Sequence, residues 1–393
     1  MSRALTEVCA AFLKLGIISF GGPIAHLGYF HSEFVARRRW IDETSYADLV
    51  ALCQFLPGPA SSQVAFALGM RRAGLAGALA ASLCFLLPSA VLMIAFGHGV
   101  TGVAGLEHAS WVHGLKLAAV AIVAQAVWGM WQNLCPDRPR VTICLAAAAI
   151  LVVAPGAWAQ IGVIAAGSIA GWAIFRHSVS APPTHEHETA RGHKAAVAAL
   201  AAFVLLLFVP SIIASATGSR SFAVFDSFYR SGSLVFGGGH VVLPLLRAEV
   251  VPRGWVSDDA FLAGYGAAQA LPGPLFTFAG YLGAVTYQGP RAWLGGVWCL
   301  LAIFLPAWLL IGGALPFWHQ LRANAWVQAA LRGANAAVVG MLVAALCSPV
   351  MTEGVRSPRD LALVLVAFGA LQFWRAPSIL VVAFCAGAAW LLG

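Results

Sequence analysis

The chain has 393 residues, of which 60% are hydrophobic and 10% are charged. This composition is too apolar for a water-soluble globular protein and is typical of a protein that crosses a membrane several times. The formal net charge is +8, but the basic residues lie in short clusters between apolar segments, which argues against a nucleic-acid-binding surface and favours loop charges that orient the chain.

Apolar segments long enough to cross a bilayer, or to enter it part of the way, follow one another along the first half of the chain. They cover residues 4–22, 45–70, 74–97, 111–133, 141–154 and 158–175. A charged, amphipathic stretch at 24–44 separates the first two and carries three arginines beside Trp40, a pattern typical of the membrane interface. We therefore predict an all-α polytopic membrane protein in contact with membrane lipid.

A polar connection follows, from Arg176 to Lys194. It contains His185 and His187, which we interpret as part of a solvated linker and not as a metal site. A clean apolar span comes next, and the second half then repeats the pattern of the first at 222–239, 260–285, 289–315, 324–346, 361–374 and 377–392. The predicted parts are a first repeat at 1–176, a linker at 177–194, an extra transmembrane helix at 195–214 and a second repeat at 215–393.

Residues of similar type recur at a nearly constant offset between the two halves, which indicates an internal repeat. The matched pairs are Phe12 and Phe228, Lys14 and Arg230, Gly16 and Gly232, Trp40 and Trp255, and Gln54 and Gln269. Seven apolar segments lie between the start of the first copy and the start of the second. If each of them crosses the membrane, the odd number makes the second copy enter from the opposite side, as an inverted-topology repeat.

Two signatures interrupt the apolar pattern in each half. The first is Phe20-Gly21-Gly22-Pro23, with its copy at Phe236-Gly237-Gly238-Gly239, and the second is Gln54-x-x-Pro57-Gly58-Pro59, with its copy at Gln269-x-x-Pro272-Gly273-Pro274. A Pro-Gly-Pro triplet cannot continue a helix, because proline lacks the N–H group and clashes with the preceding turn. Paired breaks in corresponding positions of two halves indicate a transporter's binding site, with broken helices at its centre.

The breaks have a direct chemical consequence. A helix that begins after Pro59 leaves the backbone N–H groups of Ala60, Ser61 and Ser62 free to bind an anion. The second copy repeats this arrangement, and Thr277 takes the position of Ser62. Purely structural roles stay open, since Gly-Gly pairs also serve helix packing and Pro-Gly-Pro also forms ordinary loops.

Basic residues inside the apolar segments are costly and suggest function. Lys14 and Arg230 each lie seven residues before a Gly-Gly pair, so we expect both to contribute to an anion site, with snorkelling to the interface as the alternative. For Lys116 and Arg332 we favour snorkelling. The first half has no histidine matching His240, which is either an asymmetric site residue or a satisfied polar group, and we interpret His26 as the latter.

At these two signatures and their copies, the sequence resembles the chromate ion transporter family, in its long two-domain form. The resemblance implies export of chromate, a tetrahedral sulfate-like dianion, across the bacterial inner membrane, and resistance to chromate. The expected substrate-binding residues are Lys14, Phe20, Gly21, Gly22, Gln54, Pro57, Gly58, Pro59, Ser61, Ser62, Arg230, Phe236, Gly237, Gly238, Gly239, His240, Gln269, Pro272, Gly273, Pro274 and Thr277.

Other functions remain as alternatives. A transporter or channel for sulfate or another anion fits the same residues, whereas a membrane enzyme is disfavoured, because neither an HExxH motif nor clustered carboxylates are present. The eight cysteines lie mostly in apolar segments without metal-site spacing, so we expect neither a metal nor another cofactor. With Glu7 and Lys14 inside it, segment 4–22 is not expected to be a removable signal peptide. A homodimer is left open.

The distribution of basic residues predicts an orientation. The cluster Arg37, Arg38 and Arg39 is expected on one side of the membrane. A larger set is expected on the other, cytoplasmic side and comprises Arg71, Arg72, Arg138, Arg140, Arg176, Arg191 and Lys194.

The inverted repeat can be tested by cysteine accessibility. Arg38 and Arg253 each lie two residues before the matched tryptophans of the two copies. If they are replaced by cysteine, we expect a membrane-impermeant thiol reagent to label Arg38→Cys and Arg253→Cys from opposite sides of sealed vesicles. Labelling of both from the same side would contradict the inversion.

Overall fold

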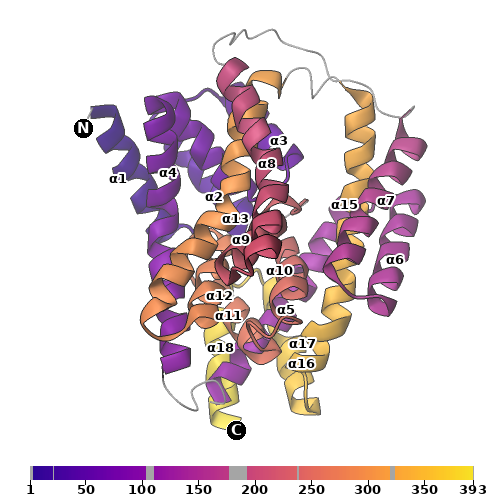
Figure 1. Cartoon of the computed structure of the whole chain (residues 1–393). Helices are drawn as coiled ribbons and strands as arrows, with labels where there is room; N and C mark the ends of the chain where they lie inside the picture. The colour runs from indigo at the N-terminus through magenta and orange to yellow at the C-terminus, as the bar shows by residue number, and fades with distance from the viewer. Residues whose placement is uncertain are drawn as a thin grey trace.

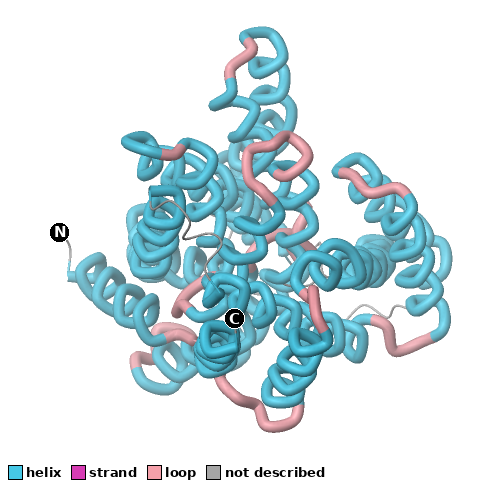
Figure 2. Tube along the Cα trace, turned by 90° about the horizontal axis from the view of Figure 1, so that it is seen from below, coloured by secondary structure: helices cyan, strands magenta, loops and turns pink. Residues whose placement is uncertain are grey.

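The computed structural model describes residues 3–20, 22–102, 110–176, 193–236, 239–318 and 324–392. Within these ranges every regular element is a helix and there is no strand (Figures 1 and 2). Six helical stretches of the described chain are long and apolar enough to cross a membrane: Ala60–Val100, Ser110–Leu134, Trp158–Phe175, Lys194–Thr217, Gly289–Phe317 and Ala325–Gly354. The predicted class, an all-α polytopic membrane protein, is confirmed.

The first half contains α1 (Arg3–Ile18), α2 (Gly22–Phe30), the π-helix η1 (His31–Arg37), α3 (Glu43–Phe55), α4 (Ala60–Gly102), α5 (Ser110–Leu134), α6 (Arg138–Val153) and α7 (Ala157–Phe175). Then comes α8 (His193–Thr217), in the place of the predicted extra helix. Most of the predicted linker, residues 177–192, lies outside the described residues.

The second half begins with α9 (Arg220–Ser233), η3 (Gly239–Val241), α10 (Val242–Val250), α11 (Asp258–Ala270), η4 (Leu275–Thr277) and α12 (Phe278–Tyr287). It continues with η5 (Gly289–Arg291), α13 (Ala292–Ala314), η6 (Leu315–Phe317), α15 (Ala325–Ala345), η7 (Leu346–Val350), α16 (Met351–Gly354), α17 (Pro358–Gln372) and α18 (Ser378–Leu392).

The chain reverses direction between α1 and α2. Phe12 of α1 stacks on Phe34, just beyond α2, with ring centroids 4.8 Å apart, and meets Phe30 edge-on at 5.8 Å. Such contacts across the Gly-Gly-Pro signature require α2 and η1 to run back along α1. Segment 4–22 therefore forms one arm of a hairpin, and α1, with 16 residues, is not among the described helices that are long and apolar enough to cross a membrane.

A second reversal lies inside α4, at Ala73 and Gly74, whose backbone angles are not helical. A Cβ atom on Gly69 would lie 2.3 Å from the carbonyl oxygen of Gly77, although residues eight apart in a straight helix are separated by about 12 Å. Thus α4 consists of two antiparallel arms, 60–73 and 75–102. The second half has the same turn between α12 and α13, where Gly283 would meet the carbonyl of Gly295 at 2.3 Å.

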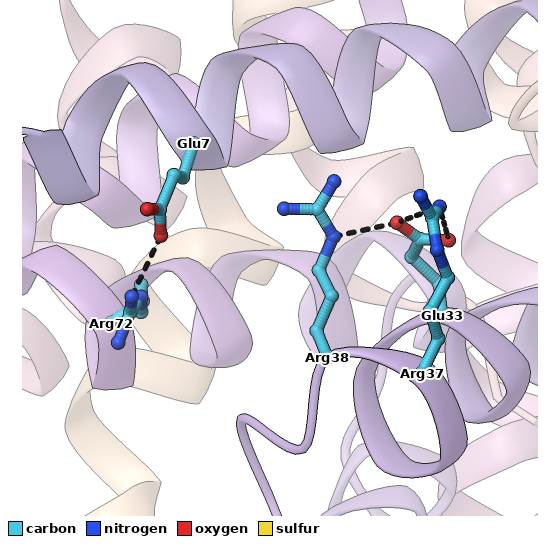
Figure 3. A network of polar contacts seen from close by, with 5 residues as sticks. All are labelled: Glu7, Glu33, Arg37, Arg38 and Arg72. Carbon is cyan, nitrogen blue, oxygen red and sulfur yellow. Dashed lines mark hydrogen bonds and ion pairs between the residues drawn. The ribbon is translucent and has the colours of Figure 1, made fainter.

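The turn at residues 73–74 brings two basic clusters together (Figure 3). Arg72 donates to Glu7 at 2.7 Å, and the guanidinium groups of Arg72 and Arg38 lie 5.2 and 5.4 Å from the ring centre of Trp40. The expectation that Arg37–Arg39 and Arg71–Arg72 lie on opposite sides is therefore wrong. The two clusters meet because of the Pro-Gly-Pro break. The chain runs inward along α3, turns at the break and runs back along the first arm of α4 to the side from which it came.

The two halves exchange helices. In α15 of the second half, a Cβ atom on Gly333 would lie 2.0 Å from the carbonyl oxygen of Gly167 in α7. In α5 of the first half, a Cβ atom on Gly114 would lie 2.3 Å from the carbonyl oxygen of Cys385 in α18. Small residues allow these close backbone approaches. Thus α15 of the second half packs against the last helix of the first half, and α5 of the first half packs against the last helix of the second.

The hairpins of the two halves lie in different parts of the molecule. In Figure 1, α2 and α3 lie in the upper part together with the N-terminus, and α11 and α12 lie in the lower part, near the C-terminus. The inversion itself stays a prediction, which the cysteine labelling above tests.

The hairpin glycines give a stability test. Gly69→Ala and Gly283→Ala should each lower the melting temperature of the purified protein, because overpacking a close contact costs about 1–3 kcal/mol. Gly129→Ala is the matched control, since nothing lies within 4 Å of its added Cβ atom. Melting is monitored by tryptophan fluorescence. Equal melting temperatures for the hairpin variants and the control variant would contradict the proposed packing.

Candidate functional site

The two Pro-Gly-Pro breaks are tied to each other's half by a reciprocal pair of hydrogen bonds. The N–H group of Gly58 donates to the carbonyl of Val235 at 2.7 Å, and the N–H group of Gly273 donates to the carbonyl of Ser19 at 2.9 Å. Ser19 and Val235 hold equivalent positions directly before the Phe-Gly-Gly signatures. All four predicted break points therefore meet, and we call Ser19, Gly58, Val235 and Gly273 the break junction.

Glycine is required at the junction for two reasons. The φ angles of Gly58 and Gly273 are +118° and +95°, a region that residues with a Cβ atom avoid. In addition, a Cβ atom on Gly58 would lie 3.1 Å from the Cβ atom of Ala307, and one on Gly273 would lie 2.7 Å from the hydroxyl of Ser89. Each break thus rests on the long helix of the other half.

The short helices that start after the breaks are capped differently. The hydroxyl and the N–H group of Thr277 both donate to the carbonyl of Pro274, at 2.8 and 3.0 Å. Ser62 is buried, and its hydroxyl has no hydrogen-bond partner within the described chain. The two predicted hydroxyls therefore occupy matching positions, but only Ser62 keeps an unpaired hydroxyl.

A buried histidine lies at the junction. His26 is fully buried, with one ring nitrogen 3.1 Å from the carbonyl oxygen of Ser19 and the other 3.4 Å from the hydroxyl of Ser61. Both ring nitrogens thus have polar neighbours, in agreement with its interpretation as a satisfied polar group.

The remaining residues of the predicted site are spread around the junction. Gln54 is exposed, Gln269 accepts a hydrogen bond from Ser378 through its carbonyl at 2.9 Å, and His240 lies 2.7 Å from the hydroxyl of Tyr265. Half-buried or buried positions are held by Phe20, Gly22, Pro57, Pro59, Phe236, Pro272 and Pro274, and Gly239 begins η3. Gly21, Gly237 and Gly238 lie outside the described residues.

The structure places Lys14 and Arg230 in different environments. The side chain of Lys14 is exposed on α1. Arg230 lies on α9, largely buried, paired with Asp226 one turn earlier and 3.7 Å from a carboxylate oxygen of Glu249. The two basic residues are therefore equivalent in sequence and different in surroundings.

Arg230 belongs to a cluster that the sequence reasoning missed. Glu249 accepts hydrogen bonds from Ser227 at 2.9 Å and Arg253 at 3.0 Å. Asp226 and Glu249 are only 5% and 4% exposed. We call Asp226, Ser227, Arg230, Glu249 and Arg253 the Arg230 cluster. Two arginines and two carboxylates cancel in charge, as burial requires. The missed signal was the repeat itself, because Glu33 and Arg37 of the first half are equivalent to Glu249 and Arg253.

A small cavity lies beside this cluster. It has a volume of about 10 Å³, room for about one water molecule, and is lined by Gln160, Ile161, Arg230, Ser231, Leu234, Leu245 and Glu249. Leu234 directly precedes Val235 of the break junction, so cavity and junction are neighbours along the chain. Within the described residues, the Nε atom of Arg230 and the hydroxyl of Ser231 are buried without a hydrogen-bond partner.

Another buried ion pair, outside the Arg230 cluster, joins the first half to the second. Lys116 of α5 is 3% exposed and donates to Asp259 at 2.5 Å, and Arg356 donates to the same carboxylate at 3.0 Å. Burial acts to raise the pKa of the Asp259 carboxyl, but Lys116 and Arg356 outweigh it, so the pKa is lower than usual. The interpretation of Lys116 as a snorkelling residue is wrong, because its ammonium group is buried in this pair.

Comparison with known proteins agrees with the duplicated fold. A family model described as chromate transporter matches residues 6–172 and 222–390. The chain is 30% identical to the chromate transport protein of Pseudomonas aeruginosa, over 98% of this chain and 92% of that protein. It is 29% identical to a probable chromate transport protein of Synechococcus elongatus, over 98% and 95% of the two chains, and 28% identical to the chromate transport protein of Cupriavidus metallidurans, over 96% and 91%. No solved structure matches the chain.

The junction can be tested with Gly273→Ala. We expect a loss of stability, from backbone strain of about 1–3 kcal/mol and from the contact with Ser89. Adding Ser89→Ala should recover the steric part. Gly218→Ala is the matched control, because Gly218 also has a positive φ angle, +64°, but nothing lies within 4 Å of its added Cβ atom. If Gly273→Ala melts like Gly218→Ala, the close contact at the junction does not matter.

Proposed function

This chain belongs to the chromate transporter family, and from that premise we propose that it exports chromate across the bacterial inner membrane by secondary-active transport and thereby gives resistance to chromate. The coarser parts of this statement, a transporter family with a chromate-like oxyanion as substrate and a multi-pass membrane protein, follow from the family and from the apolar helices. The direction, the energy source and the membrane are the proposal.

The observation that supports the proposal most is the break junction. Two helix breaks, one from each half, meet through the reciprocal hydrogen bonds of Gly58 and Gly273. A helix that starts at such a break directs free N–H groups and the positive end of its dipole toward the break. A site of this kind, at the interface of two related halves, is how broken helices hold an anionic substrate in other transporter folds.

Arg230 supplies a positive charge close to the junction, and we propose it as the basic residue that binds the dianion. It lines the cavity beside Leu234, whereas the Lys14 side chain is exposed. The backbone and hydroxyl groups at Ser61 and Ser62, with both signatures around them, complete the proposed site, whereas the N–H group and the hydroxyl of Thr277 are already bonded to Pro274.

Electrical energy is sufficient for export. When a dianion leaves a cell with a negative interior, its electrical free energy falls by about 4–5 kcal/mol at about 100 mV, since each charge contributes about 2.3 kcal/mol. No ATP-binding phosphate loop is found in the sequence. We therefore propose that the membrane potential drives export.

The second candidate is transport of sulfate or another anion. Sulfate has the shape and the charge of chromate, and backbone N–H groups recognise both features without distinguishing the central atom. The two candidates thus share the proposed site and differ only in the preferred anion.

Proteoliposomes decide between them. Purified protein is reconstituted, the vesicles are loaded with chromate or with sulfate, and efflux is followed under an imposed inside-negative potential. We expect potential-driven chromate efflux that exceeds the leak of protein-free vesicles. Arg230→Met should abolish it, and Lys14→Met, the equivalent change at an exposed position, should affect it less.

Sulfate efflux without chromate efflux would replace chromate by sulfate as the substrate. Chromate efflux that does not respond to the potential would contradict the proposed energy source.

A further inference from the structure

The second half adds polar residues to a frame that both halves share. Both have a glutamate paired with an arginine four residues later, Glu33 with Arg37 at 2.9 Å and Glu249 with Arg253 at 3.0 Å. Where α9 carries Asp226, Ser227 and Ser231, however, the equivalent positions of α1 carry Ala10, Ala11 and Leu15. The shared pair is therefore part of the fold, and the added groups, which are costly to bury, need another explanation.

Asp226, one of the added groups, and Glu249, of the shared pair, both face the guanidinium of Arg230. Arg230 is paired with Asp226 and lies 3.7 Å from Glu249, so two carboxylates from different helices face it. Together they present two negative charges and several acceptor oxygens, which are the features that a tetrahedral dianion presents to an arginine.

Two unsatisfied donors belong to Arg230 itself and to the next residue, Ser231. The Nε atom of Arg230 and the hydroxyl of Ser231 line or adjoin the small cavity and have no hydrogen-bond partner in the part of the chain that the structure describes. Ser231 is 2% exposed. Buried donors without partners are rare and need a ligand, a water molecule or an ion to satisfy them. The cavity is too small for an oxyanion unless a neighbouring group moves.

We propose that Asp226 and Glu249 form a built-in competitor for the substrate: they hold Arg230 in the substrate-free protein, and an oxyanion dianion that binds to Arg230 and Ser231 displaces them. This inference rests on the proposed function, an oxyanion transporter, and assigns to it two residues that tune affinity. The carboxylates are positioning residues, because they act on the substrate through Arg230.

The charges around Arg230 make the affinity for an oxyanion depend on pH. The groups that face Arg230 are Asp226 on its own helix, Glu249 from α10 and the Trp158 ring from α7, 5.7 Å away. Ser227 and Arg253 contact Glu249 in turn and complete the charged set. This set is neutral, and a dianion would leave it with two negative charges. Protonation of the two carboxylates removes this excess negative charge. We therefore expect the protein to take up protons when it binds an oxyanion, and its affinity for the oxyanion to rise as the pH falls.

Sulfate binding tests the inference without transport. Sulfate stays a dianion over the useful pH range, and its affinity for the purified full-length protein is measured by isothermal titration calorimetry in a chloride-free buffer. We expect Asp226→Asn and Glu249→Gln each to bind sulfate about tenfold more tightly than the unmodified protein, which corresponds to about 1.4 kcal/mol. Arg230→Met should lose binding.

Glu33→Gln is the matched control. It makes the same chemical change as Glu249→Gln at the equivalent position of the first half, where the partners are Arg37 and Arg38 and not Arg230. Its sulfate affinity should equal that of the unmodified protein. A gain of affinity in Glu33→Gln as large as that in Glu249→Gln would reduce the effect to net charge and overturn the assignment.

A second measurement does not depend on the folding of any variant. The sulfate affinity of the unmodified protein should rise as the pH is lowered, and titration in a weakly buffered solution with a pH indicator should show proton uptake. Affinity that is independent of pH, or carboxylate variants that are folded and bind sulfate no better, would overturn the proposal. Chromate efflux with either result would leave the proposed function intact, whereas tighter sulfate binding by the variants without chromate efflux would support the competitor and refute chromate as substrate.

Discussion

The reciprocal hydrogen bonds of Gly58 and Gly273 are the constraint on which the rest of the structure depends. Each satisfies the N–H group of one break with a carbonyl of the other half. A half by itself would leave the N–H groups of the half-buried Gly58 and Gly273 without these partners. The exchange of α5 and α15 between the halves acts in the same direction. The duplicated chain is therefore one folding unit, in spite of its two repeats.

Much of the surrounding polar structure repeats faithfully and supports the hairpins. His31 pairs with Glu43 at 2.8 Å in the first half, and Arg247 pairs with Asp258 at 2.7 Å at the equivalent place in the second. The N-caps of α3 and α11, Asp42 and Ser257, are also equivalent. Because such pairs occur in both halves, they account for the entry of each hairpin and carry no information on which anion is bound.

Several buried polar residues, in contrast, have no counterpart of the same type in the other half. The fully buried His26 belongs to the first half, and Asp226 and Ser231 belong to the second. A site at a pseudo-symmetric junction can thus offer an anion different ligands from its two sides. Such a difference would be useful to the proposed transporter, because a strictly two-fold site would offer the substrate the same ligands from both sides of the membrane.

The sequence alone determined the fold class, the repeat and the positions of the breaks, since apolar composition, a constant offset and the backbone chemistry of proline and glycine are local properties. It could not determine whether an apolar segment crosses or turns back, because hydropathy measures length and not direction, and so it placed Arg38 and Arg72 on opposite sides, although both lie beside Trp40. The partner of Lys116 was also beyond it, because Asp259 lies 143 residues later in the other half, and only the packing of the two halves brings these charges together. Glu249, 3.7 Å from Arg230, comes from the next helix of the same half, and only the turn between α9 and α10 places it there.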